Sequence, residues 1–180
     1  MNIFYLHPQP VICAEYHNDK HCVKMILEYA QLLCTAHRLL DGHEYFGKTA
    51  NNRNIKRWLL DDPVREEGLW KASHVNHPSA VWARASRGNY YWLYGLWTAL
   101  MDEYHHRYGK QHSARKLMTY LVSAPKNIPE GLFTEPTPAM PDDVKIPDDS
   151  LTSYRNYYIK NKTHLAKWKN RPVPEWYVTI

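Results

Sequence analysis

The sequence predicts a mainly α-helical fold: a single compact helical domain around a central helix, with a short N-terminal extended segment, a small hairpin and a long proline-rich wrapping loop. Residues 19–40, DKHCVKMILEYAQLLCTAHRLL, are apolar over most of a helix surface at about 100° per residue, so other segments must cover this helix on several sides. A second long apolar and aromatic stretch follows Pro78. With 180 residues, the chain is most simply one domain, 1–180.

The N-terminal part of the chain contains three predicted elements. Asn2 to Leu6 is apolar and is followed by two prolines, which favours a short extended segment that crosses the core. A helical turn is expected at Val11 to Tyr16. The central helix has a capping residue at Asn18 or at the aspartate after it, and Gly42 supplies the signal for its end.

The middle of the chain is expected to form a hairpin and a second long helix. His43 to Leu60 has apolar or aromatic runs around a polar Gly/Asn-rich centre, which is typical of a hairpin or extended loop. A charged connector with a helical turn is expected at residues 61–71. From Pro78 the pattern predicts one continuous helix to about Arg107.

The C-terminal part combines two helices with a long loop. A shorter helix is predicted at Gln111 to Ser123. Six prolines between positions 124 and 149 indicate an extended loop that wraps the domain. A final helix is expected at about Ser150 to Trp168, within a C-terminal helix-and-tail region, 150–180.

Composition favours an anionic partner. The net charge is +5, the pI is near 9.0, and the aromatic residues are mostly Tyr and Trp, which suit stacking and binding surfaces. We therefore expect DNA, or a nucleotide, as the partner. The three cysteines form no CxxC pair, which fits a reducing cytoplasm. No basic and apolar leader begins the chain and no apolar stretch approaches 18 residues, so we expect a protein that does not bind membranes. We expect a monomer. The sequence contains neither a P-loop nor a GxSxG motif.

A narrow polar row on the central helix is the strongest candidate for a site. We call it the polar seam, and its residues are Lys20, Lys24, Glu28, Gln31 and Thr35. If the seam faces water, Lys24 and Glu28 form an ordinary i,i+4 pair worth a few tenths of a kcal/mol. If it faces a cleft, its amines and carboxylate can bind phosphate and move protons.

Other side chains offer weaker candidates. His74 and His77, or His17 and His21, have spacings that occur in metal sites, but with 11 histidines such pairs arise by chance, so we expect neither a metal nor another cofactor. Cys22 points to the apolar side of its helix, which favours a buried and unreactive thiol.

The seam fits the cleavage of an N-glycosidic bond. A carboxylate among cations, Glu28, can stabilise an oxocarbenium-like sugar or position a nucleophile. The nucleophile can be a lysine crowded by another cation, or the terminal amine of the chain, whose ordinary pKa is lower than that of a lysine. The segment that begins at Met1 must lie near the central helix if it crosses the core.

Three motifs carry a family resemblance. They are the opening NIFYLHP, the run KHCVKMILEYAQLL with Lys20, Lys24, Glu28, Gln31 and Leu33, and NHPSAVW with Asn76, His77, Pro78 and Trp82. Over about the first 110 residues the chain resembles the pyrimidine-dimer DNA glycosylases (the phage endonuclease V-like family). The remainder looks like uncharacterised tailed-phage proteins.

The resemblance implies a helical DNA-repair enzyme, a glycosylase and lyase that acts on damaged pyrimidine bases in DNA through an N-terminal amine assisted by a helix glutamate. Glu28 matches the helix glutamate of the family, and with the seam lysines Lys24 and Lys20 it forms the expected catalytic set. The expected location is the cytoplasm of a bacterial host cell. The expected nucleic-acid-binding residues are His21, Gln31, Lys48, Arg53, Arg57, His77, Arg84 and Arg87. Two alternatives stay open: a non-catalytic phage protein that binds nucleic acid or nucleotide, for example to antagonise host defence, and another base- or nucleotide-modifying enzyme.

Overall fold

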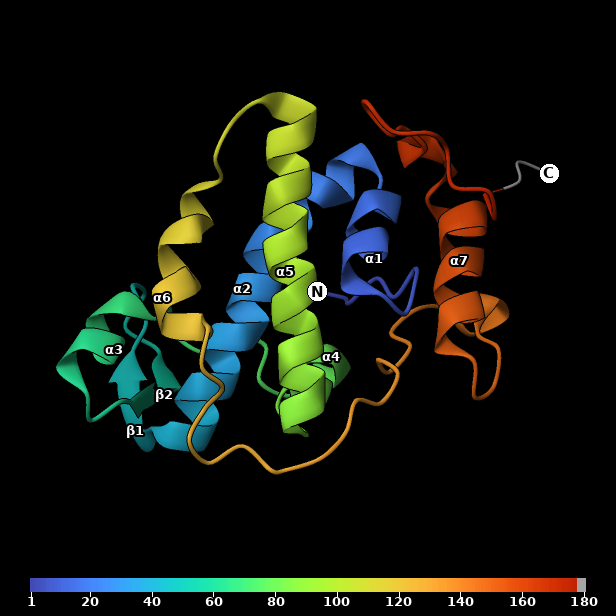
Figure 1. Ribbon diagram of the computed structural model, residues 1–180. Helices are drawn as coiled ribbons and strands as arrows, with labels where there is room; N and C mark the ends of the chain where they lie inside the picture. Colours follow the sequence, from blue (N-terminus) through green and yellow to red (C-terminus); the bar gives the residue numbers. More distant parts are fainter. Residues whose placement is uncertain (178–180) are drawn as a thin grey trace.

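Helices α2 (Asp19–Asp41) and α5 (Arg87–Tyr108) lie side by side at the centre of the computed structural model, which describes residues 1–177 (Figure 1). They run in opposite directions, because Arg107 near the end of α5 lies 2.9 Å from Asp19 at the start of α2. The described residues contain a single sheet of two strands. The predicted mainly α-helical class is therefore confirmed.

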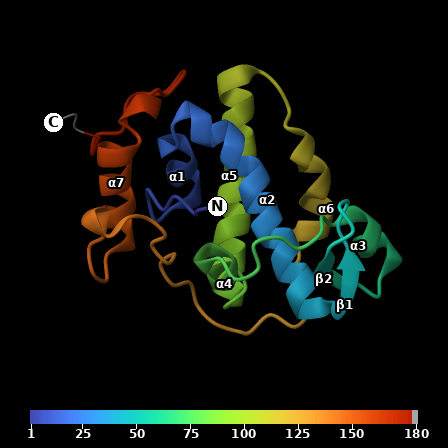
Figure 2. The same ribbon diagram turned by 180° about the vertical axis from the view of Figure 1, so that it is seen from behind.

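The shorter elements surround this pair. In chain order they are α1 (Pro10–Tyr16), β1 (His43–Lys48), β2 (Asn54–Leu59), α3 (Pro63–Gly68), α4 (Pro78–Ala83), η1 (Ser113–Leu117), α6 (Met118–Leu121), η2 (Asp142–Val144), α7 (Ser150–Asn161) and η3 (Thr163–Leu165). The hairpin and α3 cover one end of the molecule, whereas α1 and α7 lie on the other side of α5 (Figures 1 and 2).

Local capping signals set the ends of α2. The Asn18 side chain accepts a hydrogen bond from the His21 amide at 2.9 Å, which satisfies one donor of the first turn. At the other end, the Gly42 amide donates to the Arg38 carbonyl at 3.0 Å. The predicted helix, 19–40, is thus confirmed to within one residue.

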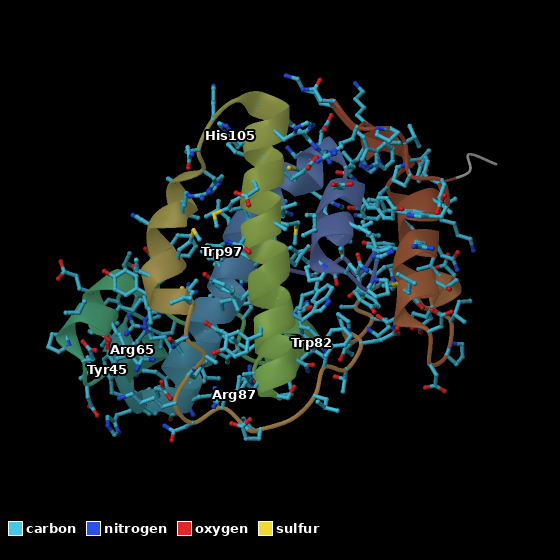
Figure 3. All side chains as sticks on the ribbon, viewed as in Figure 1. Tyr45, Arg65, Trp82, Arg87, Trp97 and His105 are labelled. Atoms are coloured by element: carbon cyan, nitrogen blue, oxygen red, sulfur yellow. The ribbon has the colours of Figure 1, made fainter. Side chains whose placement is uncertain are left out.

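The N-terminal segment crosses the core, as predicted. Ile3 to Leu6 are almost completely buried without pairing as a strand. The amide of Phe4 donates to the Tyr29 hydroxyl of α2 at 3.2 Å, so a side chain satisfies a buried backbone group where a sheet partner is missing. Trp97, labelled in Figure 3, is also fully buried, and its indole nitrogen donates to the Ile26 carbonyl of α2 at 3.0 Å.

The prediction of one helix from Pro78 to about Arg107 was wrong. The chain leaves the helical path after Ala83, and Ser86 caps a new helix by accepting from the Asn89 amide at 3.1 Å. The break lets Gly88 approach the proline-rich loop so closely that a Cβ there would lie 2.4 Å from the Phe133 nitrogen.

Two further helices are shorter than predicted. The pattern at residues 111–123 forms only the short helices η1 and α6. The final helix ends at Asn161. The Thr163 hydroxyl donates a hydrogen bond to the Ile159 carbonyl at 2.7 Å, and this carbonyl is the acceptor that the Thr163 amide would use in a continued helix. The proline-rich loop, 124–149, does wrap the domain, passing below α5 toward α7 in Figure 1.

One buried arginine fastens the hairpin and α3 to α2. The Arg38 guanidinium is fully buried and donates to the carbonyls of Trp58, Glu66, Leu69 and Trp70, as well as pairing with the Glu66 carboxylate. Buried charge is tolerated when its donors are satisfied in this way. The hairpin is therefore held in a fixed position relative to the polar seam.

Within residues 1–177, no helix combines the length and apolar character needed to cross a bilayer.

Candidate active site beside the N-terminal amine

The terminal amine of Met1 lies beside Glu28 in the middle of α2. The nitrogen is 3.8 Å from Glu28 Oε2, and the Met1 side chain is only 3% exposed. The other carboxylate oxygen, Oε1, lies 3.2 Å from Lys24 Nζ, one turn earlier on the helix. Figure 2 shows the N-terminus next to α2 and above α4. Glu28 therefore lies between two amines of different kinds.

His77 faces the same place from the start of α4. Burial lowers the pKa of His77, the positive charges of the terminal amine and of His74 lower it further, and the carboxylate of Glu28 opposes these effects. Its Nδ1 accepts from the Ser79 amide at 3.1 Å, which leaves the proton of the neutral ring on Nε2. The site thus combines an amine, a carboxylate and a neutral imidazole from three segments.

The polar seam passes from solvent into the core along α2. Lys20 and Lys24 are exposed, Glu28 and Gln31 are half-buried, and Thr35 is fully buried. The Thr35 hydroxyl accepts a hydrogen bond from the Ser73 amide, so the last residue of the polar seam fastens the segment before α4 to α2. Lys20 lines a different groove from the surroundings of Glu28, near the C-terminal segment.

His21 was predicted to bind nucleic acid, but it lies in the core. Its ring is 5% exposed, stacks on Phe4 at 4.0 Å and has Nδ1 2.6 Å from the Tyr158 hydroxyl. Burial lowers its pKa to about 2, so the ring stays neutral. A nucleic acid cannot reach His21 in this arrangement, and we withdraw that assignment.

The cations of the hairpin lie away from Glu28, at the end of α2. Arg53 is exposed at the turn, and Lys48 Nζ donates to the Asn54 side chain at 2.6 Å. Arg57 is half-buried and lines a groove of about 350 Å³ together with His74. This groove lies between strand β2 and the segment that leads to the start of α4. It therefore extends from the hairpin toward His77.

Arg84 and Arg87 lie on either side of the break between α4 and α5. The Arg84 Nη1 atom is buried and has no hydrogen-bond partner within the described part of the chain, and burial lowers the pKa of this guanidinium. Arg87, labelled in Figure 3, pairs with Glu130 at 2.7 Å on the surface. Arg84 therefore has a buried donor without a partner among the described residues, whereas Arg87 lies at the surface, where Glu130 pairs with its Nε atom.

No family model, curated protein or solved structure matches the chain. The resemblance to pyrimidine-dimer glycosylases therefore stays a hypothesis based on the motifs around Glu28 and His77.

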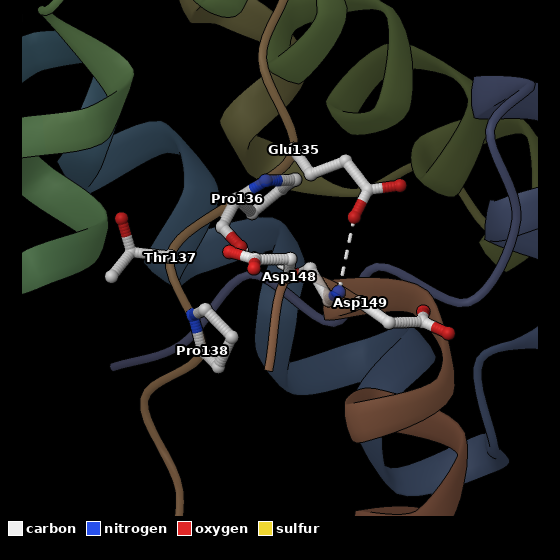
Figure 4. A pocket seen from close by; sticks show the side chains of 7 residues that line it. Glu135, Pro136, Thr137, Pro138, Asp148 and Asp149 are labelled. Carbon is white, nitrogen blue, oxygen red and sulfur yellow. Dashed lines mark hydrogen bonds between the residues drawn. The ribbon is translucent and has the colours of Figure 1, made fainter. Parts of the chain in front are cut away.

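Two other candidate sites fit this chemistry less well. Cys22 is fully buried, and burial raises its pKa to about 12, which leaves the thiol protonated. A pocket of about 410 Å³ lies between the proline-rich loop and the start of α7 (Figure 4). Its lining includes the carboxylates of Glu135, Asp148 and Asp149, so its charge opposes phosphate binding. Among residues 1–177, no group of three His, Cys, Asp or Glu side chains is placed to hold a metal ion.

Proposed function

We propose that the protein is a DNA glycosylase with associated lyase activity, in which the Met1 amine is the nucleophile and Glu28 is its acid–base partner. The observation that carries the proposal is the 3.8 Å separation between the amine and Glu28 Oε2. The N-terminal segment is held in place by the side chain of Asn2. Its Nδ2 atom donates to the Ala139 carbonyl, and its Oδ1 atom accepts from the Tyr154 hydroxyl. A fixed nucleophile beside a carboxylate is the arrangement that this reaction needs.

The proposed reaction forms a Schiff base. The unprotonated amine attacks C1′ of the sugar, and the base leaves with the electron pair of the N-glycosidic bond. The bond between C1′ and O4′ then breaks as the C1′–N double bond forms. The two amine protons end on the departing base and on O4′, and Glu28 can carry one of them. In the lyase step a base takes the C2′ proton and passes it to water. The electrons of the C2′–H bond form a C2′–C3′ double bond, and the 3′ phosphate leaves with the electron pair of the C3′–O bond.

An α-amine suits this role better than a lysine. Its ordinary pKa is about 8, against about 10 for a lysine, so a larger fraction is unprotonated near neutral pH. Lys24, 59% exposed and 3.2 Å from Glu28, is placed to hold a phosphate of the bound strand. His77, as a neutral imidazole, can donate from Nε2 to the leaving base or to O4′.

The proposal is tested by borohydride trapping on DNA that contains an abasic site. The protein is expected to form a covalent adduct, because hydride reduces the Schiff base to a stable secondary amine. A matched variant with two residues added before Met1 displaces the amine from Glu28 and should give no adduct. DNA binding without an adduct by the unextended protein would overturn the enzymatic proposal.

The anchored N-terminus favours a second candidate function, a non-catalytic nucleic-acid-binding protein. The Met1 side chain is 3% exposed, so it anchors the N-terminus in the core while Glu28 holds the amine by charge. In the second candidate function, the seam and hairpin cations hold phosphate and the Met1–Glu28 pair only fastens the N-terminus. Tight DNA binding together with failed trapping is the result that selects this alternative.

Three lysine and arginine substitutions separate binding from chemistry. Lys20→Ala, Lys24→Ala and Arg53→Ala should each weaken DNA binding, because each removes roughly one phosphate contact. Each should also reduce the slope of log K against log salt concentration by about one. Only Lys24, which contacts Glu28, should also lower the single-turnover rate at saturating substrate. The measurements are binding at several salt concentrations and single-turnover kinetics. Equal single-turnover rates for all three variants would remove Lys24 from the chemistry.

A further inference from the structure

A basic groove lies where the start of α2, the end of α5 and the segment after α7 meet. Its volume is about 440 Å³, and its lining includes Lys20, Tyr108, His164 and Lys167. Neither the hairpin nor the Met1–Glu28 site contributes to it. The groove brings one seam lysine together with cations from residues more than a hundred positions later in the chain.

The C-terminal segment is fastened so that its lysines face outward. The Asp19 amide donates to the Lys167 carbonyl at 2.8 Å, and the Lys169 amide donates to Asp19 Oδ1 at 2.8 Å. Between these lysines, Trp168 is 7% exposed and its indole nitrogen donates to the Tyr16 carbonyl at 2.9 Å. Because the tryptophan is anchored inward, the lysines on both sides of it are held at the surface.

The charge of the groove is positive after internal pairing. The one carboxylate in its lining, Asp19, is engaged by Arg107 at 2.9 Å. Among residues 1–177, no carboxylate lies within ion-pair distance of Lys20, Lys167 or Lys169, in contrast to Lys24 with its partner Glu28. Lys169 Nζ lies 5.2 Å from the centre of the Tyr108 ring, at the edge of the same groove.

We propose that this groove binds the phosphodiester backbone of the DNA strand that flanks the Met1–Glu28 site. The inference rests on the proposed function for the identity of the ligand. Lys20 and Glu28 are eight residues apart on one helix, which corresponds to about 12 Å. At about 3.4 Å of rise per nucleotide, the groove lies three to four nucleotides from the reacting sugar.

The chemistry of the lining favours a nucleic-acid strand over a small anion. Unpaired amines spread along an open groove match a row of phosphates, whereas a single phosphate is normally held by convergent donors. Tyr108 adds an aromatic surface of the kind found beside nucleic-acid backbones. The C-terminal segment therefore extends the seam of α2 into a longer track for one strand.

The test measures binding to uncleavable duplexes that contain a tetrahydrofuran abasic analogue. In each duplex of the series, neutral methylphosphonate linkages replace two adjacent phosphates. The replaced pair is moved stepwise along the strand on both sides of the abasic analogue. For the parent protein, neutral linkages three to four nucleotides from the analogue on one side should weaken binding about three- to tenfold. Lys20→Ala and Lys167→Ala should each show a similar loss on unmodified DNA, and little further loss when those linkages are neutral.

Lys116→Ala is the matched control, since Lys116 is also exposed but lies on η1, on the other side of α5 (Figure 1). It should bind every duplex as the parent does. Position-independent losses, or parent-like binding by Lys167→Ala, would overturn the groove assignment. If trapping succeeds while the scan shows no such position, the groove inference alone fails. If the parent binds none of the duplexes, the proposed function fails with it.

Discussion

Glu28→Gln is expected to lower turnover on abasic or lesion-containing DNA by at least about a hundredfold, with little change in DNA affinity. Glutamine keeps the size of the side chain but can neither take up a proton nor hold the amine of Met1 by charge. General acid–base groups typically contribute factors of this order. The measurement is single-turnover kinetics at saturating DNA, together with a binding curve for the variant.

Stability controls separate this role from a structural one. Glutamine keeps the shape of the half-buried Glu28 side chain, and the ion pair with Lys24, which is 59% exposed, is worth about 1 kcal/mol or less, so urea unfolding should change little. Gln31→Ala, one turn further along the same helix face, is the matched control: it removes an expected nucleic-acid contact but no ionisable group, so it should alter DNA affinity and keep the single-turnover rate at saturating DNA. Unchanged turnover in Glu28→Gln would contradict the mechanism. A loss of about 3 kcal/mol in the free energy of unfolding, comparable to a hundredfold loss of rate, would instead assign Glu28 to the fold.

The folded protein should lose about 6 kcal/mol of stability between pH 7 and pH 5, about 2 kcal/mol from each of the buried rings of His17, His21 and His37. Burial lowers the pKa of His17 and of His37 to about 4 each, because both rings lie in the core. His17 lies between the Cys13 carbonyl and the Tyr29 hydroxyl, and the lowering of its pKa by burial outweighs the raising effect of that carbonyl. His37 contacts the Tyr90 hydroxyl and the Arg65 guanidinium, whose charge lowers the pKa of the ring further.

The sign follows from proton binding. A histidine whose folded-state pKa is lowered stays neutral in the folded protein but takes up a proton in the unfolded chain below about pH 6.5. Its stabilising contribution is complete above that pH and falls as the pH drops toward the folded-state value of about 4. His21, with a pKa of about 2, acts in the same direction.

Urea unfolding at pH 8, 7, 6 and 5 measures this effect. The paired carboxylates Glu66 and Glu103 have lowered pKa values, so they lose their contribution only below about pH 4.5, in a separate window. A free energy of unfolding that stays level from pH 7 to pH 5 would contradict the assignment of these histidines to the core.

Those parts of the fold that depend on neighbouring residues could be predicted from the sequence. The ends of α2 follow from Asn18 and Gly42, and the hairpin follows from its polar centre. The break after Ala83 could not be predicted, because it depends on Gly88 meeting the loop near Phe133, more than forty residues later. Helical periodicity continues through the break and gives no sign of it.

The same distinction applies to the site. The i,i+4 spacing of Lys24 and Glu28 predicts their contact, and the apolar N-terminal segment predicts that Met1 comes near α2. The fate of His21 depends on Tyr158, which is distant in sequence, and Lys20 meets Lys167 only through the folded C-terminal segment. Local patterns cannot contain such contacts.

The central claim, that the Met1 amine acts as the nucleophile beside Glu28, is tested most directly by locating the reduced cross-link. The protein is trapped with borohydride on abasic DNA, digested with protease and nuclease, and the modified peptide is identified by mass spectrometry. The account predicts that the sugar remnant is attached to the α-nitrogen of Met1. Attachment to Lys20 or Lys24, or the absence of any cross-linked peptide, would contradict it.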